Sequence, residues 1–324
     1  MNFTEINKAN GTVEGFCFVK TLEVKKTARG VPYLDLTLTD SSGEIGAKLW
    51  DYKPEIHSQI KLNSLIKVRG TISTFNDAPQ MRVERVRPAV EADGVRIEDF
   101  VPSTEYGGDI MFNELRAVAS GFENEQLKKL VVYILDENRE KLVYWPAAFR
   151  LHHAIRGGLL YHTLSILRLA QAVAAVYPSV DKDLLFSGVI LHDVAKISEF
   201  EVSETGIATG YTVEGNLIGH LVKGAMNIEA AGSELGTDRE LLMLLEHMIL
   251  SHHGEPEFGS AVRPMFLEAE ILSELDMLDA RVYEISQSVA EIEPGKFTQR
   301  QWALDNRKLY NHGRKPIEPK AELL

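Results

Sequence analysis

Imidazole and carboxylate side chains recur in the second half of this sequence at intervals of a few helical turns. Such groups are costly to bury unless they are paired or bind a cation, so a series of them within apolar segments predicts a metal site. Histidine is scarce, with 10 in the chain, and five of them fall in this series. A set of His and Asp without cysteine suits Mn, Fe, Mg or Zn bound for chemistry rather than a closed structural zinc site. The candidate ligands are His162, His192, Asp193, His220, His252, His253 and Asp276.

The segment from Leu184 to Lys196 stands at the centre of this series. Its apolar residues recur at helical spacing, which predicts a largely buried helix that ends in His192 and Asp193. Lys196 lies three residues after Asp193. It could form an internal ion pair with Asp193, or it could neutralise charge on a phosphoryl group, and both interpretations stay open. Asp193 and Lys196 are the candidate catalytic residues.

Several neighbouring polar residues have less certain roles. His152 and His153 are either part of the mouth of the site or exposed residues at a helix end. His247, on an apolar helix, is expected to be a core or supporting histidine rather than a ligand. Asp279 is expected to be solvated or to stand behind the ligands. The sequence does not decide whether His152, His153 and His247 contact the site.

Length and composition indicate an ordinary globular protein. The chain has 324 residues, 44% hydrophobic and 25% charged, which is enough for two domains. Its single cysteine, Cys17, excludes a disulfide framework and a thiolate zinc cluster. The N-terminus shows no secretory-signal pattern, and no uninterrupted apolar run approaches membrane-spanning length. We therefore expect a cytoplasmic protein without a membrane partner.

Charge divides the chain into two parts. Residues 1–90 contain 13 Lys and Arg and 10 Asp and Glu, a net charge of +3. Because the whole chain has a net charge of −12, the remaining residues have a net charge of −15. An acidic protein is a poor general partner for nucleic acid. A mildly basic first part and a strongly acidic second part predict two different roles, and the acidic part is where a multivalent cation would bind.

Residues 11 to 90 have the patterns of strands. Leu34, Leu36 and Leu38 alternate with polar residues, as in a half-buried strand, and turn-forming residues separate the segments. Five short antiparallel strands with a helical insertion between the third and the fourth fit an OB-fold barrel. The predicted strands are 12–24, 34–39, 45–50, 64–70 and 81–87, with the short helix at 54–60.

Basic and aromatic residues alternate on this predicted barrel. A basic groove with stacking platforms is what single-stranded nucleic acid requires. Any single aromatic residue could instead fill the small barrel, because small barrels need bulky cores. The candidate nucleic-acid-binding residues are Lys25, Lys26, Arg29, Tyr33, Trp50, Arg82, Arg85 and Arg87.

Residues 91–108 are rich in Gly, Pro, Asp and Glu and are predicted to form a linker. Nearly everything beyond it has helical periodicity, except a predicted hairpin over 200–210. Strands followed by helices indicate separate domains. The expected architecture is multidomain, with an all-β OB-fold barrel at 1–90 and an all-α helical bundle at 109–324. The clearest predicted helices are 121–138, 163–176, 183–197, 217–231, 239–250 and 264–291.

The order His162, His192-Asp193, Asp276 resembles the signature of the HD-domain metal-dependent phosphohydrolases. With the OB-fold in front, residues 10 to 312 resemble the YhaM family of 3′→5′ exoribonucleases, through Gly-Gly-Leu-Leu-Tyr-His, Leu-His-Asp-Val-Ala-Lys and Ser-His-His-Gly-Glu-Pro. The residues after His253 do not read Gly-Tyr-Pro, unlike those of HD-GYP cyclic-dinucleotide phosphodiesterases. The resemblance implies two divalent ions, one held by His162, His192, Asp193 and Asp276, and a second held by His220, His252 and His253, with Asp193 bridging.

Three hypotheses follow. The first is an exonuclease that captures single-stranded RNA, or also single-stranded DNA, on the OB domain and hydrolyses it with two ions in the HD domain. Manganese is the first choice of metal, with Mg, Co, Fe and Zn as alternatives. The second is an HD-type nucleotide or cyclic-dinucleotide phosphohydrolase with a regulatory OB domain. The third is a single-strand binder without activity, which the complete ligand set disfavours. A homo-oligomer is compatible with the sequence. The sequence does not specify the RNA targets, a preference for RNA over DNA, or the metal used in the cell.

Overall fold

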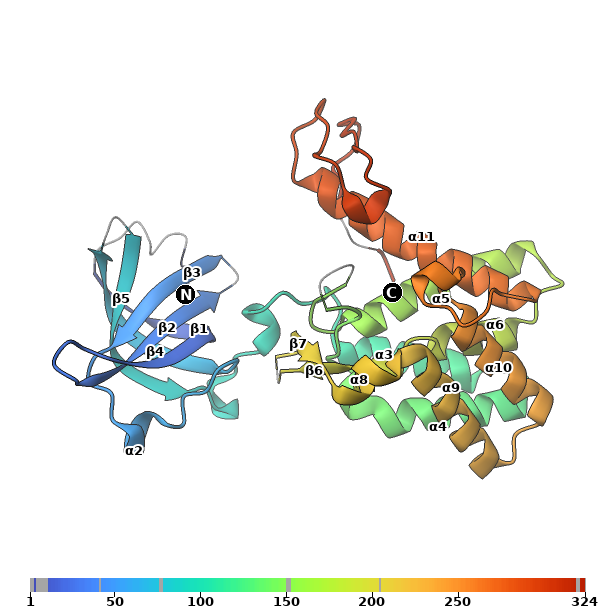
Figure 1. The fold of residues 1–324 in the computed structure, drawn as a ribbon, viewed down its shortest axis with the longest axis horizontal. Coiled ribbons are helices and arrows are strands. Elements are labelled where there is room, and N and C mark those ends of the chain that lie inside the picture. The colour runs from blue at the N-terminus through green and yellow to red at the C-terminus, as the bar shows by residue number, and fades with distance from the viewer. Residues whose placement is uncertain are drawn as a thin grey trace. The chain divides into compact units, whose positions relative to one another are not determined.

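The computed structural model describes residues 3, 11–40, 42–75, 78–149, 153–203, 205–318 and 321–323. Two compact units divide the chain, one of Met1–Ser103 with Ser203–Thr205 and one of Thr104–Val202 with Gly206–Leu324. Figure 1 shows the first as a β-barrel and the second as a helical bundle. Each has its own apolar core. The predicted order of an all-β barrel followed by an all-α bundle is confirmed.

The first unit is a closed five-stranded barrel with the order β1-β2-β3-β5-β4. Alternate residues of its strands point inward, as the pattern predicts, so Leu34, Leu36 and Leu38 are all buried. The predicted helical insertion lies between β3 and β4. The elements are β1 (Gly11–Lys26), β2 (Pro32–Asp40), β3 (Gly43–Leu49), α2 (Pro54–His57), β4 (Leu65–Phe75) and β5 (Ala78–Pro88), followed by the 3₁₀ turns η1 (Glu91–Asp93) and η2 (Ile97–Asp99).

The prediction of antiparallel pairing throughout the barrel is wrong at one position. Strand β1 is antiparallel to β2 and β4, β2 to β3, and β4 to β5. A ring with an odd number of strands cannot alternate in direction all the way round, so one pair must be parallel. The parallel pair is β3 with β5, where Lys48 lies opposite Arg82.

The second unit consists of helices around one large core, with a small antiparallel hairpin at the predicted place, 200–210. Several helices start at a side-chain cap. Asn124 caps α4, for example, by accepting hydrogen bonds from the N–H groups of Gln126 and Leu127, which is why α4 starts after the predicted Gly121. The elements are α3 (Gly108–Ser120), α4 (Glu125–Leu142), α5 (Gly158–Val176), α6 (Lys182–Leu191), α7 (Lys196–Glu199), β6 (Phe200–Val202), β7 (Ala208–Tyr211), α8 (Val213–Leu217), α9 (Gly219–Leu235), α10 (Arg239–Ser251), η3 (Pro256–Phe258), α11 (Leu267–Ala290) and η4 (Trp302–Leu304).

The predicted helix 183–197 is interrupted. Helix α6 ends at Leu191, and the next residues are joined by tighter bonds, from Val194 N to Leu191 O (3.2 Å) and from Lys196 N to Asp193 O (2.9 Å). Such i to i+3 turns advance by about 120° per residue, and their i and i+3 side chains eclipse. The apolar pattern could not reveal this change, because Val194, Ala195 and Ile197 remain buried through the turn. Lys196 is thereby brought into line with Asp193.

A second predicted helix is also interrupted. Helix 217–231 is split before Gly219, whose φ of +72° is a left-handed conformation that glycine adopts readily. Helix α3 was not among the named predictions.

Among the described residues, α5 is the one helix long and apolar enough to cross a membrane by composition. It packs against α6 and α11 and is mostly buried, as a core helix would be.

Candidate metal centre and nucleic-acid interface

His162 lies one turn inside α5, and a glycine pair before it shapes the loop. Gly157 has a φ of +76°, and a Cβ on Gly158 would lie 2.0 Å from the carbonyl oxygen of His153. Only glycine permits this close approach. The loop therefore places the ring of His153 5.5 Å from that of His162 at the start of the helix.

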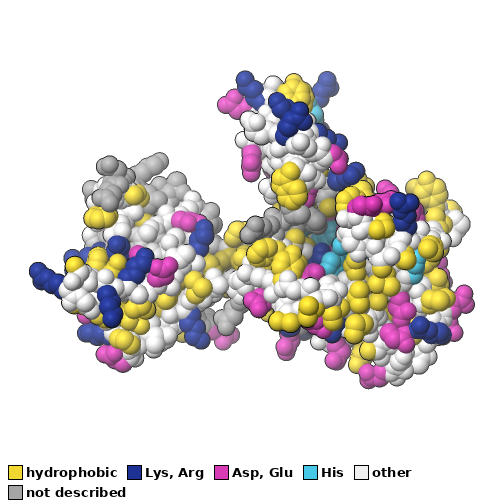
Figure 2. All heavy atoms as spheres, viewed as in Figure 1, with side chains coloured by type: hydrophobic (Ala, Val, Ile, Leu, Met, Phe, Trp, Pro, Cys, Tyr) yellow, Lys and Arg dark blue, Asp and Glu magenta, His cyan; other side chains and the backbone are white. Residues whose placement is uncertain are grey.

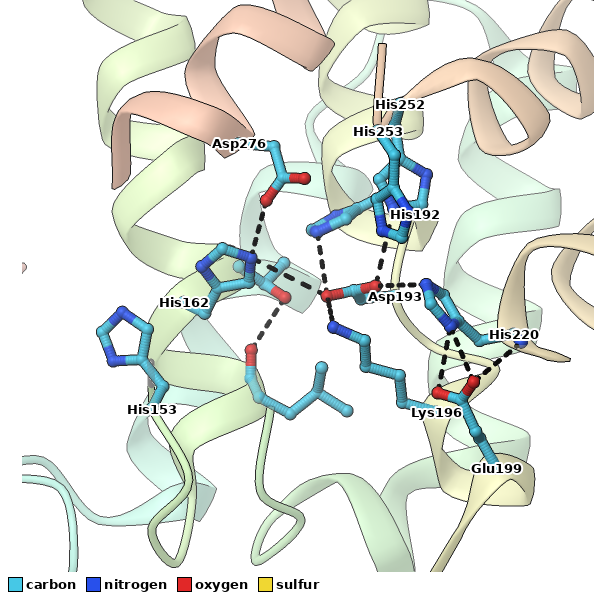
Figure 3. A network of polar contacts seen from close by, with 12 residues as sticks. His153, His162, His192, Asp193, Lys196, Glu199, His220, His252, His253 and Asp276 are labelled. Carbon is cyan, nitrogen blue, oxygen red and sulfur yellow. Dashed lines mark hydrogen bonds and ion pairs between the residues drawn. The ribbon is translucent and has the colours of Figure 1, made fainter. Parts of the chain in front are cut away.

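Asp193 is the centre of the site, and Figure 3 shows four histidines and Lys196 around its carboxylate. Its Oδ2 lies 3.2 Å from Nε2 of His192 and 3.7 Å from Nε2 of His162. Its Oδ1 lies 3.5 Å from Nε2 of His220 and 3.7 Å from Nε2 of His252. Each carboxylate oxygen thus faces its own pair of histidines, and the Asp193 side chain is buried between them.

The two remaining candidate ligands complete these two groups. Asp276 on α11 is 3.0 Å from Nε2 of His162. His253 joins His220 and His252 in a group whose potential ligand atoms lie within 4.8 Å of one another. All seven candidate ligands are therefore brought together, with three on one side of Asp193 (His162, His192 and Asp276) and three on the other (His220, His252 and His253).

All five histidines of the set present Nε2 to the site, because in each ring Nδ1 bonds an oxygen behind it. His192, His252 and His253 donate to the carbonyl oxygens of residues 189, 249 and 258, at 2.7, 2.8 and 3.0 Å. A carbonyl can only accept, so in these three rings the proton is on Nδ1 and Nε2 carries a lone pair. His162 and His220 are held in the same way by carboxylates.

Those two carboxylates are Asp279 and Glu199. Nδ1 of His162 is 2.8 Å from Asp279 Oδ2, and Nδ1 of His220 is 2.9 Å from Glu199 Oε2. Asp279 also accepts hydrogen bonds from His153 (3.0 Å) and from Ser165. Asp279 is buried, so it stands behind the ligands rather than in solvent. Its position one helical turn after Asp276 was the signal for this role in the sequence. The sequence did not predict the role of Glu199.

Lys196 donates a 2.6 Å hydrogen bond to Asp193 Oδ2, so the ion-pair interpretation describes its geometry. The indole of Trp145 donates to the carbonyl oxygen of Lys196 at 2.9 Å and fixes the start of α7. Burial alone would lower the pKa of Lys196, but Asp193 raises it, so the ammonium stays charged. Lys196 also lines the cleft described below, where it is available to a bound anion.

The electrostatics keep the carboxylates ionised. Burial would raise the pKa of Asp193, yet Lys196 and His192 lower it well below its usual range. Burial likewise opposes ionisation of Asp276, whose pKa is depressed chiefly by His162. For His162, burial lowers the pKa, but Asp276 and Asp279 raise it to about 10. Burial, together with His252 and His220, lowers the pKa of His253 to about 3, so this ring is neutral and a competent ligand.

This donor set fits divalent cations. Among the described residues, Nε2 of His192, His220 and His252 and Oδ1 of Asp193 are buried polar atoms without a hydrogen-bond partner. Buried polar groups of this kind are rare without a partner, and they indicate a site for an ion or water between them. All of them point inward and are lone-pair donors of the kinds that bind Mn, Fe and Zn.

The ligands open into a cleft of about 560 Å³. Figure 2 shows histidine side chains at the floor of a hollow on the visible face of the helical unit. The lining combines candidate ligands with four aromatic residues. Its lining residues are Ala147, Ala148, Phe149, Lys196, Glu199, Phe200, Tyr211, His220, His253, Asp276, Met277, Ala280 and Trp302.

The histidines that the sequence left undecided are now placed in part. His153 contacts Asp279 and not the central carboxylate, and its ring packs 4.1 Å from that of Tyr283. His247 accepts a hydrogen bond from the N–H of Met265 at 3.0 Å, away from the cluster, as expected of a supporting residue. His152 lies outside the described residues.

On the barrel, one group of predicted residues surrounds a lysine that the sequence analysis did not select. Lys48 Nζ lies 5.5 Å from the ring of Tyr33, 5.4 Å from Trp50 and 5.9 Å from Phe75. Trp50 and Phe75 are 41% and 57% exposed, so they do not fill the barrel. Arg82 is exposed beside Lys48. This group, Tyr33, Lys48, Trp50, Phe75 and Arg82, is called the aromatic platform.

The other predicted barrel residues are not part of the platform's ring contacts. Arg85 and Arg87 line a second groove with Lys67 and Arg69. Arg87 is engaged by Asp93 through two bonds of 2.6 and 2.7 Å, which makes it less available than the sequence suggested. Lys25, opposite Tyr33, pairs with Asp35 at 2.6 Å. Lys26 and Arg29 are exposed at the end of β1 and in the following turn.

Two family models match this chain. Residues 159–281 match the model described as HD domain. Residues 9–89 match the model described as OB-fold nucleic acid binding domain. The chain therefore combines an OB-fold with an HD domain, and the seven candidate ligands all lie within the matched HD range. The fold and domain content implied by the sequence resemblance are confirmed at this level.

Several solved structures are similar to about a quarter of the chain. A replication protein A heterotrimer bound to ssDNA is 19% identical over 26% of this chain and 62% of that chain, with a TM-score of 0.21. PriB from Ralstonia solanacearum is 14% identical over 25% of this chain and 100% of that chain, with a TM-score of 0.23. The second OB-fold domain of replication protein A from Methanococcus maripaludis is 17% identical over 25% and 85%, with a TM-score of 0.20. At such TM-scores, none of these likenesses bears on function.

Proposed function

We propose that this protein is a metal-dependent 3′→5′ exoribonuclease that captures single-stranded RNA on its OB domain and hydrolyses the phosphodiester in its HD domain. The observation that carries the proposal is the buried Asp193 carboxylate, whose two oxygens face two separate pairs of histidine Nε2 atoms. Direction of digestion and preference for RNA rest on the resemblance to the YhaM family. The cytoplasm is the proposed location.

His162, His192, Asp193 and Asp276 would hold one divalent ion, and Asp193, His220, His252 and His253 the second. Two such ions lower the pKa of a water molecule and offset the charge of a phosphate, and manganese is the proposed metal. The chain itself contributes fixed ring orientations through Nδ1 and an ionised Asp193. Lys196 supplies a positive charge at the cleft, where it stabilises negative charge on the phosphoryl oxygens.

The OB domain supports nucleic acid over a mononucleotide as substrate. Exposed aromatic rings beside Lys48 and Arg82 are suited to stacked bases and to phosphates. A mononucleotide or cyclic dinucleotide would not need such a platform. An HD-type nucleotide or cyclic-dinucleotide phosphohydrolase with a regulatory OB domain is the second candidate, because the metal cluster serves either reaction.

The test is a denaturing gel of 5′-end-labelled single-stranded RNA, with Mn²⁺ and with chelator. We expect the labelled strand to shorten progressively with Mn²⁺ and to stay intact in chelator. Single-stranded DNA of the same sequence tests the preference, and a cyclic dinucleotide tests the second candidate. Intact RNA together with rapid cyclic-dinucleotide hydrolysis would show that the proposal is wrong.

Asp193→Asn provides the matched variant. It keeps the shape of the side chain and removes its charge, so we expect a loss of activity of roughly 100- to 1000-fold or more. Metal analysis should also show fewer than two bound ions per chain. Asp109→Asn, on an exposed ion pair with Arg139, is the control and should retain activity.

A further inference from the structure

The segment after α11 forms an ordered arm, here defined as residues 294–318. Backbone hydrogen bonds join Gly295 to Asn311, Thr298 to Leu309 and Gln301 to Arg307, at 2.7, 2.9 and 3.0 Å. The side-chain amide of Asn311 donates to the carbonyl oxygen of Ile292 at 2.9 Å. The arm is therefore a hairpin anchored to the end of α11, and Figure 1 shows it projecting from the other helices of its unit.

The arm has a charge opposite to that of its surroundings. It contains six Lys and Arg and two Asp and Glu, a net charge of +4. Residues after position 90 have a net charge of −15 in all, so those outside the arm have a net charge of −19. All six cations are exposed. None of them forms an ion pair with an acidic side chain in the described part of the chain, whereas Lys25 and Arg87 of the barrel are paired. The six are Lys296, Arg300, Arg307, Lys308, Arg314 and Lys315.

Three large aromatic residues lie among these cations, and all are largely exposed. Phe297, Trp302 and Tyr310 are 62%, 77% and 50% exposed. Figure 2 shows apolar side chains between Lys and Arg side chains on the projecting part. Aromatic side chains interleaved with free cations are the composition of a surface that binds single-stranded nucleic acid.

Trp302 links the arm to the cleft of the metal centre. It lines that cleft together with His220, His253 and Asp276. The neighbouring Leu304 is buried and holds the turn in place, while the indole of Trp302 remains exposed. Tyr211 and Phe149, whose rings are 5.7 Å apart, line the same cleft. An aromatic face is therefore present within the cavity where the scissile phosphate would bind.

We propose that the arm is a second strand-binding element, located in the HD unit itself. Trp302 stacks on a base of the nucleotides that enter the cleft, and the free cations of the arm bind the phosphates that follow. The ligand class is single-stranded nucleic acid, so the inference rests on the proposed function and extends it. The arm gives the HD unit a strand-binding site of its own, although the rest of that unit is acidic.

The first test measures binding by the full-length protein in chelator, where hydrolysis cannot occur. The probes are a 12-nucleotide single strand and the same strand with abasic residues at its three 3′-terminal positions. Trp302→Ala should weaken binding of the intact strand by roughly 5- to 150-fold and leave binding of the abasic strand unchanged. Trp302→Phe should retain most of the affinity. Equal affinities of Trp302→Ala and wild type, or equal losses on both strands, would overturn the proposal.

Intrinsic fluorescence provides a direct readout. In a Trp50→Phe background the remaining indoles are Trp145, which is 4% exposed, and Trp302. Binding of the intact strand should quench the exposed indole, and the abasic strand should not. An unchanged spectrum at saturating strand would contradict stacking on Trp302.

The second test concerns the cations. Replacing Arg300, Arg307 and Lys308 together by Gln should reduce the slope of log affinity against log salt by about 2, at roughly 0.7 per phosphate contact. Replacing Arg116, Lys128 and Arg139 by Gln is the control. It removes the same charge from paired cations of the same unit and should leave the slope unchanged. Equal slopes for the two triple variants would show that only net charge matters and would overturn the proposal.

A docking role for the arm would give a different result. If Trp302→Ala changes the mass measured by light scattering while strand affinity stays at the wild-type value, the arm binds a second copy of the chain and the proposal is wrong. The proposed function is tested separately, because wild-type protein that degrades RNA with Mn²⁺ supports it whatever Trp302→Ala does. Wild-type protein that neither binds nor degrades single strands would refute both.

Discussion

At the scale of single residues, the oxygen behind each metal-facing histidine determines what the site can bind. Three of these oxygens are backbone carbonyls at helix ends, which no side-chain change can remove. The other two belong to Asp279 and Glu199. A carboxylate behind a ligating histidine fixes the tautomer and raises the basicity of the ring. These two side chains are thus the positions where the site can be adjusted without touching a ligand.

The first prediction concerns Asp279→Asn. The Asn amide keeps one oxygen that can accept a hydrogen bond, but it lacks the negative charge that faces His162, His153 and Ser165. Metal affinity should therefore fall by about 10- to 100-fold. Titration calorimetry with Mn²⁺ measures this directly. Asp136→Asn, which breaks an exposed pair with Arg116, is the control and should bind metal as wild type does. An Asp279→Asn variant with wild-type affinity would show that Asp279 has no positioning role.

The second prediction concerns protons on His162 in the metal-free protein. Its pKa is raised to about 10, so the proton stabilises the folded state fully below the ordinary value of 6.5, and this contribution is lost as the pH rises through about 10. A metal binds only the neutral ring, so ion and proton compete. Affinity for Mn²⁺ should therefore increase between pH 7 and 9 with release of a proton, measurable by calorimetry in buffers of different ionisation enthalpy. Proton release that is absent at pH 7 would contradict this assignment.

The ligand set could be anticipated from residue type and spacing, but the supporting groups could not. His162 is marked by the scarcity of histidine and its place in an apolar helix, whereas Asp276 is one of several acidic residues on α11. Asp276 and Asp279 are one helical turn apart and of the same type, so periodicity cannot say which faces Nε2 and which faces Nδ1 of His162. That depends on the rotation of α11, which the packing of the whole unit decides. Glu199 depends in the same way on the turn before α7.

At the scale of elements, five of the seven candidate ligands lie at helix ends. His192 and Asp193 follow α6, His252 and His253 follow α10, and His220 starts α9. Helix ends leave carbonyl groups without intrahelical partners, and His192 and His252 use such carbonyls of α6 and α10 to fix Nδ1. A continuous helix over 183–197, as the apolar pattern predicted, would not have left His192 at such an end. Apolar periodicity detects which residues are buried, not where the winding tightens.

The third prediction concerns the glycine pair before α5. In Gly158→Ala the new Cβ would lie 2.0 Å from the His153 carbonyl oxygen, so the backbone must shift. We expect a loss of about 1–3 kcal/mol in the free energy of unfolding, from the cost of overpacking, and weaker metal binding because His153 and His162 share Asp279. Thermal and urea unfolding measure the first effect. Gly121→Ala, whose nearest contact is 3.4 Å, should be close to neutral.

At the scale of the whole molecule, charge separates capture from chemistry. The balance of +3 over residues 1–90 contrasts with −15 over the rest. Two divalent ions would offset only part of that negative charge, so the HD unit outside its arm repels a polyanion at long range. The aromatic platform and the arm are the two described surfaces where unpaired cations and exposed aromatic rings occur together. A long strand offers enough nucleotides for both surfaces, whereas a strand of two or three offers few.

The fourth prediction uses this difference. Replacing Lys48 and Arg82 together by Gln should reduce the slope of log affinity against log salt for single-stranded RNA by about 1.4, at roughly 0.7 per phosphate contact. Turnover of a small phosphodiester such as bis(4-nitrophenyl) phosphate should remain at the wild-type rate, because the metal centre is intact. Replacing Lys20 and Lys53 by Gln, which removes two lysines paired with Glu44 and Asp51, is the charge-matched control and should change the slope less. If the platform variant and the control gave the same slope, the platform would not be a phosphate-binding surface.

Oligonucleotides of two or three residues should also be degraded more slowly than long strands by the wild-type protein, since they offer too few nucleotides for the platform to hold while a phosphodiester is bound at the metal centre. Equal rates at both lengths would mean that the metal centre takes its substrate directly from solution and that the barrel serves another purpose.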